Sequence, residues 1–406
     1  MNMLDIITKK KNKEVLTHEE LSYAFNSYLK KEIPDYQMTS LLMAIVINGL
    51  TFEETFDLTK IFIDSGETFK FDKKVCDKHS TGGIGDTVTL VAIPILGALN
   101  IPVVKMSGRG LGITGGTIDK LESIPGFNVN LTKEDYYNNL DKIGIVVGAQ
   151  TNDLVPLDKV IYALRDVSGT TESIPLIASS IMSKKIACGA DYILIDVKWG
   201  SGALVKTKKA AEVLANYLIE IGKRFNRQVK TIISDMNEPL STCIGNALEV
   251  EEAINVLKGE KNKLRETSLE VAGNLASMYL NIPYDEAYNR ASEVLDNNKA
   301  YDMFKTWISN QGGDLSKLKI SDKVILIKSN QDGIINHINA LKVGELSVKL
   351  GAGRITKDSK IDYSVGIKLL KQSGDLVKKD DIIAKLYVND LNIKLTKDDI
   401  NFYSVK

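Results

Sequence analysis

The sequence predicts an α/β protein with a separate helical domain and a small third unit at its C-terminal end. Three observations predict this architecture. Helix signals dominate the first 66 residues, short β-rich runs alternate with helical stretches from about residue 73, and turn signals break up short apolar runs after residue 330. The 406 residues suffice for two or three domains of roughly 150 residues each. The chain is therefore long enough to bury a large core.

The N-terminal helices are predicted from their start signals. Thr17 and Glu20 have the spacing of a capping box, and so do Thr51 and Glu54. Each pair stands just before an apolar, helix-periodic run. We therefore expect one helix to begin after Thr17 and another after Thr51.

The segment between these two pairs, QMTSLLMAIVIN at 37–48, is apolar almost all round. A helix of this kind is buried on several sides or lies at an interface between subunits. Gly49 follows it, and we expect this glycine to end the helix in a left-handed cap.

The middle of the chain carries five β-rich runs without strict polar/apolar alternation, which is typical of a parallel sheet covered on both faces. They lie at residues 75–79, 101–106, 143–149, 192–198 and 229–235. Two predicted helices between 157 and 189 interrupt the alternation, and we expect them to join the N-terminal helices. The predicted domains are a helical domain (1–66 and 157–190), an α/β domain with a mixed, mainly parallel sheet (73–150 and 191–329), and a small, mostly β unit of α+β class (330–406).

Composition excludes several classes of protein. The 52 Lys and Arg residues balance the 52 Asp and Glu residues, which argues against a dedicated nucleic-acid or anionic-membrane surface. Three widely spaced cysteines and three scattered histidines indicate neither a disulfide framework nor a zinc site. The N-terminus lacks the apolar core of a signal peptide, and the longest apolar stretch, 88–104, falls short of the roughly 20 clean residues of a membrane span. We expect a cytoplasmic protein with no nucleic-acid or membrane partner.

A first glycine-rich loop, KHSTGGIGDT at 78–87, follows a predicted strand and opens a predicted helix. Its glycines allow a tight turn that presents backbone N–H groups, and a helix N-terminus favours an anion. Lys78 adds a full positive charge, and Ser80, Thr87 and Thr89 add hydroxyl donors. An ordinary glycine-rich turn between strand and helix is the alternative, but it needs neither the lysine nor the hydroxyl groups.

A second loop, KMSGRGLGITGGT at 105–117, also follows a strand and also joins a lysine to glycines and hydroxyls. Neither loop has the spacing of a nucleotide P-loop or of a dinucleotide fingerprint. Ligands of open α/β sheets bind at the carboxyl ends of the strands. The two loops therefore predict a site for one small oxyanion such as phosphate.

A third group lies on the two inserted helices. Ser180 and Lys184 are four residues apart and so share one helix face, and Arg165 ends the preceding helix. A lone lysine is usually a solvated surface residue. Here it follows an apolar run, and arginine is scarce in this chain, so a functional role is the competing interpretation.

These stretches resemble the thymidine phosphorylase family of pyrimidine nucleoside phosphorylases, and the resemblance extends over nearly the whole chain. It implies an enzyme of nucleoside salvage in which inorganic phosphate displaces the base, releasing a free pyrimidine and a (deoxy)ribose 1-phosphate. A helical domain on the base side and an α/β domain on the phosphate side face each other across a cleft in this family. The matching stretches are KHSTGGIGDTVTL, KMSGRGLGITGGTIDKLESIPGF, GAQTNDLVPLDKVIYALRDV, ESIPLIASSIMSKKIACGAD, SDMNEPL with GNALEV, and LGAGR.

The resemblance also implies the site residues. Catalytic roles fall to His79, Arg165 and Lys184, which together with Ser180 hold the pyrimidine. The phosphate-site positions are Lys78, Ser80, Thr89, Lys105, Ser107 and Thr117. No organic cofactor is implied, but some members bind a monovalent cation such as K⁺, at positions that match Gly85, Thr87, Leu240, Cys243 and Glu252. The family is typically a homodimer that pairs through helical-domain surfaces, which suits the apolar helix at 37–48.

Three departures leave the substrate range open. Ile113 stands where many relatives have His, Trp199 is a large residue between small ones, and Leu204 replaces an aromatic residue. Activity on uridine, thymidine and deoxyuridine is our first expectation, and restriction to 2′-deoxynucleosides is the second. An anthranilate-type phosphoribosyltransferase is a further alternative, although no convincing acidic pair for Mg²⁺ stands near the base site. A non-catalytic nucleoside-binding protein is the last alternative.

Overall fold

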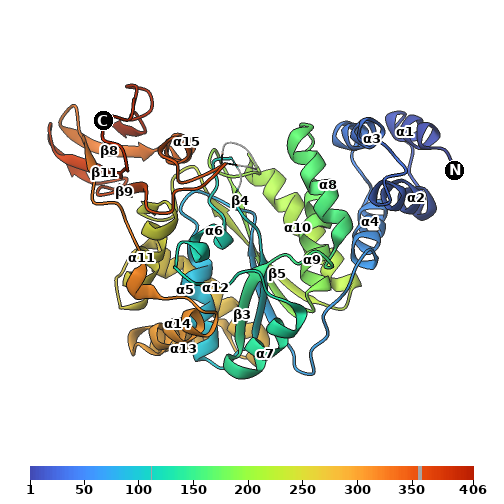
Figure 1. Ribbon diagram of the computed structural model, residues 1–406, viewed down its shortest axis with the longest axis horizontal. Helices are drawn as coiled ribbons and strands as arrows, with labels where there is room; N and C mark the ends of the chain where they lie inside the picture. Colours follow the sequence, from blue (N-terminus) through green and yellow to red (C-terminus); the bar gives the residue numbers. More distant parts are fainter. Residues whose placement is uncertain (111, 355–358) are drawn as a thin grey trace. The chain divides into compact units, whose positions relative to one another are not determined.

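The computed structural model describes residues 1–110, 112–354 and 359–406, drawn in Figure 1. The predicted fold class, a helical part with a parallel α/β part and a small antiparallel part, is confirmed. Contacts divide the chain into two compact units. Unit 1 comprises Met1–Asp77, Gln150–Ile193 and Lys209–Thr231, and unit 2 comprises Lys78–Ala149, Leu194–Lys208 and Ile232–Lys406.

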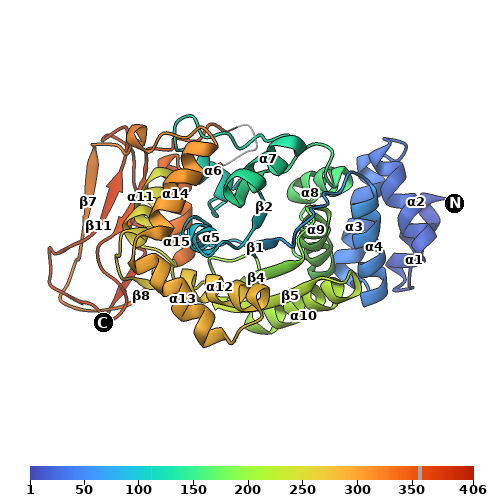
Figure 2. The same ribbon diagram turned by 90° about the horizontal axis from the view of Figure 1, so that it is seen from below.

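Unit 1 is helical. Figure 2 shows its first four helices beside α8 and α9, and α4 packs directly on α9. The capping boxes at Thr17 and Thr51 are both present, as predicted. Its helices are α1 (Met3–Lys11), α2 (His18–Leu29), α3 (Asp35–Asn48), α4 (Phe52–Asp64), α8 (Pro156–Val167), α9 (Ile174–Ala187) and α10 (Lys208–Arg224).

The predicted left-handed cap at Gly49 is wrong in one respect. Gly49 ends α3 and donates its N–H to the Ile45 carbonyl at 2.8 Å, with φ of 72° but ψ of 178°. The positive φ still demands glycine, but the extended ψ sends the chain straight on to Thr51, the N-cap of α4. The next helix begins so soon that no full left-handed turn forms.

The central sheet has the strand order β3-β2-β1-β4-β5, and β2 pairs with β3 in parallel. All five predicted strands are confirmed. They are β1 (Cys76–Ser80), β2 (Val103–Ser107), β3 (Ile145–Ala149), β4 (Tyr192–Trp199) and β5 (Gln228–Asp235).

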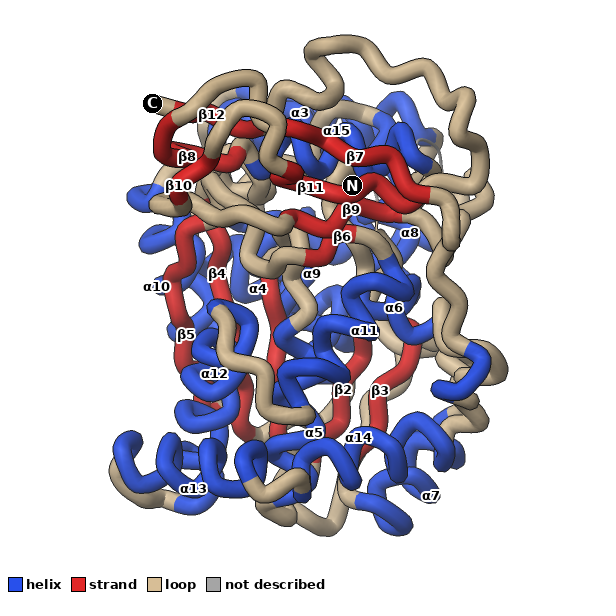
Figure 3. The backbone as a smooth tube through the Cα atoms, turned by 90° about the vertical axis from the view of Figure 1, so that its left-hand side faces the viewer, coloured by secondary structure: helices blue, strands red, loops and turns tan. Residues whose placement is uncertain are grey.

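Helix α5 (Val88–Ala98) is the central helix of unit 2. Almost all of its side chains are buried because α11 to α14 pack around it, and Figure 3 shows α5 with α12 and α14 alongside the strands. This burial explains the long apolar stretch in the sequence. The other helices of this part are α6 (Thr117–Glu122), α7 (Lys133–Ile143), α11 (Asn246–Leu257), α12 (Lys263–Leu280), α13 (Tyr284–Asp296) and α14 (Lys299–Asn310).

The C-terminal part is mostly β, as predicted. One sheet has the order β6-β9-β11-β7 and the other β10-β8-β12, and neighbouring strands in both pair antiparallel. Strand β6 (Cys243–Ile244) comes from the middle of the chain and joins β9. The remaining elements are η1 (Leu315–Lys317), β7 (Val324–Lys328), β8 (Gly333–Ile338), α15 (Ala340–Leu350), β9 (Gly366–Leu369), β10 (Leu376–Val377), β11 (Ile382–Tyr387) and β12 (Tyr403–Val405). Across the described ranges, every helix is too short or too polar to cross a bilayer.

Candidate active site

Lys78 and Lys105 meet on neighbouring strands of unit 2, each as the third residue of its strand. The Lys105 Nζ donates to the Lys78 carbonyl oxygen at 2.6 Å, and the Lys78 Nζ lies 3.5 Å from the Thr89 Oγ1 on α5. Both lysines are buried, with 1% and 2% of their surface exposed. His79 and Ser80 follow on β1 and are half-buried. The two lysines that the sequence predicts for one anion site therefore lie together.

Asp86, two residues before α5 begins, organises further charge around Lys78. Its carboxylate lies 3.8 Å from the Lys78 Nζ and 3.9 Å from the Lys198 Nζ, and its carbonyl accepts from the Lys120 Nζ at 2.5 Å. Burial alone would raise the pKa of Asp86, but these three lysines hold it well below its ordinary value. Burial lowers the pKa of Lys78, and Asp86 opposes that effect. Asp86 therefore favours the charged form of Lys78.

The buried cluster as a whole suits an anion. Lys198 pairs with Asp196 at 2.6 Å, and Lys120 pairs with Glu249 at 3.1 Å. Burial raises the pKa of Glu249 to about 7. With Lys78 and Lys105, the cluster contains four buried lysines and the three buried carboxylates of Asp86, Asp196 and Glu249. Sequence analysis missed Asp86, Lys120, Lys198 and their partners, although Asp86 stands inside the first glycine loop.

The other predicted phosphate-site residues surround these loops. The Ser80 Oγ accepts from the Gly82 N–H at 3.2 Å, and the Ser80 hydroxyl also helps to lower the pKa of Asp86. Ser107 ends β2 and Thr117 opens α6, and both are half-buried. Their positions at the strand end and helix start agree with the predicted arrangement, and their contact with phosphate stays a prediction.

The second glycine loop is held at Gly110. Its N–H donates to the Asp119 Oδ2 at 2.6 Å, and its carbonyl accepts from the Arg354 Nη1 at 3.2 Å. Arg354 also pairs with the Asp119 Oδ1 at 2.8 Å. A side chain at Gly110 would meet the Gly116 backbone nitrogen at 2.6 Å, so only glycine fits. Asp119 and Arg354 therefore fix both peptide groups of Gly110, while Leu111 lies outside the described residues.

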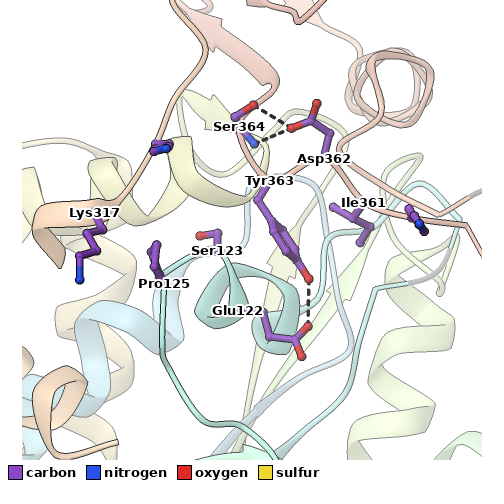
Figure 4. A pocket seen from close by; sticks show the side chains of 10 residues that line it. Glu122, Ser123, Pro125, Lys317, Ile361, Asp362, Tyr363 and Ser364 are labelled. Carbon is purple, nitrogen blue, oxygen red and sulfur yellow. Dashed lines mark hydrogen bonds between the residues drawn. The ribbon is translucent and has the colours of Figure 1, made fainter. Parts of the chain in front are cut away.

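An open pocket of about 560 Å³ lies beside α6. In Figure 4 the Tyr363 side chain points at Glu122, and its hydroxyl donates to the Glu122 Oε2 at 3.1 Å. Burial and Glu122 raise the pKa of Tyr363 to about 12. Three exposed lysines, Asp362, two serines, Pro125 and Ile361 line the rest, and none of the predicted phosphate-site residues does. The buried lysine cluster, and not this hollow, is thus the candidate anion site.

The positions predicted for a monovalent cation come together around Glu252. Its Oε2 accepts from the Cys243 N–H at 2.8 Å, and its Oε1 accepts from the N–H and the hydroxyl of Thr242 at 3.0 and 2.9 Å. Burial raises the pKa of Glu252, and the hydrogen bonds from Cys243 and Thr242 oppose that effect. A buried carboxylate held only by neutral donors can accept a cation.

Gly85 and Thr87 lie at the same place. A side chain at Gly85 would meet the Ser241 nitrogen at 3.1 Å and the Cys243 carbonyl at 3.5 Å, and the Leu240 N–H donates to the Ile84 carbonyl at 3.0 Å. The Thr87 Oγ1 is buried and has no hydrogen-bond partner among the described residues. Carbonyl, hydroxyl and carboxylate oxygens are the ligands that hard cations prefer. The residues present therefore fit such an ion.

The predicted pyrimidine residues of unit 1 centre on Lys184. Its Nζ donates to the carbonyl and the Oγ of Ser180 at 2.9 and 2.8 Å, and it forms an ion pair with Asp158. The Lys184 side chain is 24% exposed, and Asp158 and Ser180 are buried. Burial lowers the pKa of Lys184, and Asp158 opposes that effect. The predicted sharing of one helix face by Ser180 and Lys184 is confirmed.

Arg165 is buried and closes the turn between α8 and α9. Its Nε donates to the Thr170 carbonyl at 3.0 Å, its Nη2 to the Thr171 carbonyl at 2.8 Å, and its Nη1 to the Leu176 carbonyl at 3.3 Å. Burial lowers its pKa. The guanidinium is thus fixed by backbone carbonyls, and its contact with a pyrimidine stays a prediction.

Sequence analysis missed two further residues of this group. Asp158 and Tyr162 precede Arg165 by seven and three residues on α8, a spacing that puts all three on one helix face. The Lys184 Nζ lies 5.9 Å from the centre of the Tyr162 ring. This spacing was the sequence signal from which Asp158 and Tyr162 could have been predicted.

The three departures lie in different surroundings. The backbone of Ile113 packs against Gly344 of α15, where an added side chain would meet the Ile113 carbonyl at 3.0 Å. Trp199 ends β4 and bridges to Val205, and Leu204 is 39% exposed.

Family comparisons agree with this geometry. The helical bundle domain of the glycosyl transferase family matches residues 4–66, the a/b domain of that family matches 72–301, and the pyrimidine nucleoside phosphorylase C-terminal domain matches 334–401. An anthranilate phosphoribosyltransferase from Thermus thermophilus shares the fold, with a TM-score of 0.61 over 76% of this chain and 99% of that chain at 17% identity. The chain is therefore a glycosyl transferase by class.

Two curated relatives narrow the class. A pyrimidine-nucleoside phosphorylase of Bacillus subtilis (strain 168) is 47% identical over 97% of this chain and 93% of its own length. Another, of Geobacillus stearothermophilus, is 46% identical over 96% and 92%. This chain belongs to the pyrimidine-nucleoside phosphorylase family.

Proposed function

We propose that the protein transfers the pentose of a pyrimidine nucleoside to inorganic phosphate, in nucleoside salvage, and that its substrates are uridine, thymidine and deoxyuridine. The observation that carries the proposal is the pair of buried lysines, Lys78 and Lys105, which a hydrogen bond joins across neighbouring strands. The names of the relatives support the same reaction. The runner-up, a site restricted to 2′-deoxynucleosides, differs only in sugar selectivity.

The phosphate side needs charge but no catalytic base. Phosphate is already an anion, so no group has to generate the nucleophile, and the paired carboxylates that glycosidases use are not required. Lys78 and Lys105, with the N–H groups of the glycine loops, replace the hydration of phosphate by fixed donors. Donors that are already in place do not have to reorganise as the reaction proceeds.

The pyrimidine side has to stabilise a departing base. As the bond between C1′ and N1 breaks, the sugar becomes cation-like and negative charge grows on the ring. Hydrogen bonds from Lys184, Arg165 and His79 strengthen as this charge grows, so they favour the transition state over the ground state. His79 can also give the ring a proton, because an ordinary histidine pKa of about 6.5 lies near working pH.

We propose K⁺ as a structural ion and no organic cofactor. Gly85, Thr87, Leu240, Cys243 and Glu252 would hold it. The ion supplies positive charge beside the buried Glu252 carboxylate. The residues around it keep the turn at Gly85–Thr87, which leads into α5, in place.

We propose a homodimer that forms through the helical unit. Tyr36 and Ile47 of α3 are each 73% exposed, and Met43 lies between them on the same helix. An exposed apolar face of this kind is typical of an interaction surface. The spacing of seven and four residues keeps the three side chains on neighbouring turns.

The function is tested by mixing the protein with phosphate and uridine or thymidine, without Mg²⁺. Release of free base together with a pentose 1-phosphate is the expected result. Cytidine should not react, because it carries a 4-amino donor where uridine has an accepting carbonyl, and a donor mismatches cationic donors. Nucleoside binding without base release contradicts the proposal and favours a non-catalytic binding protein. Initial rates on uridine, deoxyuridine and thymidine separate the two substrate ranges. The same assay with K⁺ or tetramethylammonium tests the cation.

Arg354→Met should weaken the use of phosphate, because Gly110 then loses the donor on its carbonyl and the second glycine loop shifts. We expect the KM for phosphate to rise on the order of tenfold while the KM for uridine changes little. Steady-state kinetics with each substrate varied in turn measures the split. Arg290→Met removes an exposed arginine paired with Glu286 and serves as the control. Equal changes in both KM values would contradict the role.

A further inference from the structure

Three oxygen atoms surround the Lys184 ammonium. They belong to the Asp158 carboxylate, the Ser180 carbonyl and the Ser180 hydroxyl. A lysine ammonium has three N–H donors, so all of them are engaged. The Ser180 carbonyl belongs to helix backbone and the Asp158 carboxylate is buried, whereas the Ser180 hydroxyl can rotate. An incoming ligand can therefore take the donor that points at the Ser180 Oγ, while the other two contacts hold the ammonium still.

Asp158 lies in surroundings that favour negative charge. It is 1% exposed and lies in the first turn of α8, which begins at Pro156. The N-terminus of a helix favours negative charge through its free N–H groups and the helix dipole. In the described structure its ion-pair partner is Lys184. The buried Asp158 carboxylate and the partly buried Lys184 ammonium thus stabilise each other.

The remaining charges around Lys184 are positive or are occupied elsewhere. Arg165 of α8 and Lys185 of α9 both disfavour its protonation, and Tyr162 presents the face of its ring. Lys185 itself pairs with the buried Asp77 at 2.7 Å. Asp158 is therefore the carboxylate that compensates the Lys184 charge.

Helix α4 also packs on α9, but among the described residues none of its carboxylates is a group that shifts the pKa of Lys184. It contacts α9 through the Thr55 carbonyl, which accepts from the Ser179 hydroxyl at 3.1 Å. Its buried carboxylate, Glu54, is paired with Lys10 at 2.7 Å.

We propose that Asp158 is a positioning residue for the reaction: it holds the Lys184 ammonium beside Ser180 and keeps it protonated, so that one N–H can be given to a pyrimidine carbonyl. The inference rests on the proposed function and extends it to a residue that does not touch the substrate. Burial and two neighbouring cations favour the neutral amine, which cannot stabilise an anionic leaving group. Without Asp158, Lys184 loses its proton at lower pH, and activity falls as pH rises through that range.

The test is the pH dependence of uridine phosphorolysis by Asp158→Asn. We expect kcat/KM for uridine to fall on the order of 10- to 100-fold, with the alkaline limb of the profile displaced to lower pH and the KM for phosphate nearly unchanged. Asp64→Asn is the matched control, because Asp64 forms an exposed Lys–Asp pair with Lys60 in the same unit. An alkaline limb that stays where the parent protein has it would overturn the proposal.

A second variant separates charge from packing. Asp158→Glu keeps the negative charge in a longer side chain, so it should lose rate but keep the parent's alkaline limb, and an equal displacement of the limb by both variants would speak for a purely structural role. In a Lys184→Ala background, Asp158→Asn should cost little more, because the two residues act as a unit. Should the parent itself release no base from uridine, the proposed function fails. If the parent is active and both Asp158 variants match it, only this inference fails and the proposed function stands.

Discussion

Replacing Lys184 by alanine is expected to lower kcat/KM for pyrimidine nucleosides on the order of 10²-fold or more, by analogy with the loss of one fixed donor to a developing anion. The loss should fall on kcat as well as on KM, because the bond from Lys184 strengthens while the base departs. Initial rates with uridine and thymidine at saturating phosphate measure it.

An exposed lysine of the same unit provides the matched control for Lys184→Ala. Lys60→Ala removes a lysine of the same unit from an exposed pair with Asp64, and it should leave both kinetic constants near those of the parent. Thermal unfolding of both variants checks the fold, because Lys184→Ala also leaves the buried Asp158 without its ion-pair partner. A Lys184→Ala protein with parent-like phosphorolysis would exclude the role of Lys184 in the reaction.

Replacing Lys78 by methionine is expected to lower phosphorolysis on the order of 10²- to 10³-fold and to raise the KM for phosphate. Lys78 is fully buried beside Thr89 and Asp86, so no solvent-exposed lysine can take its place. Methionine keeps the volume of the side chain, and Lys198 and Lys120 still compensate Asp86. Loss of activity is therefore expected without loss of the fold.

Kinetics with phosphate varied, together with calorimetric titration of phosphate into each protein, measure this effect. Lys305→Met is the control in the same unit, because Lys305 is half-exposed and pairs with Asp302 on the helix surface. If Lys78→Met bound phosphate as tightly as the parent protein does, the anion site would not lie at Lys78.

The local elements were predictable because each depends on nearby residues. The capping box at Thr17 and the five β-rich runs can each be recognised from residues within a few positions of one another. The structure confirms both predictions. Gly49 shows where this kind of reasoning ends. Its positive φ follows from the glycine, but its ψ depends on where the next helix begins.

Among site residues, the sequence by itself determined the two glycine loops with Lys78 and Lys105, and the pairing of Ser180 with Lys184 on one turn of helix. These are short-range features, because a loop after a strand and a spacing of four on a helix have one geometry each. The resemblance of the motifs then named the family, and the comparisons confirm it.

Only the tertiary structure decided which charges compensate these lysines. Asp86, Lys120 and Lys198 come from three separate elements, and Asp158 reaches Lys184 across two helices. Nothing in the local pattern of a buried carboxylate says which ammonium it will meet, because that depends on how strands and helices are stacked. The sequence thus determined which groups can bind an anion, whereas the packing of the strands and helices decided which charged partners these groups have.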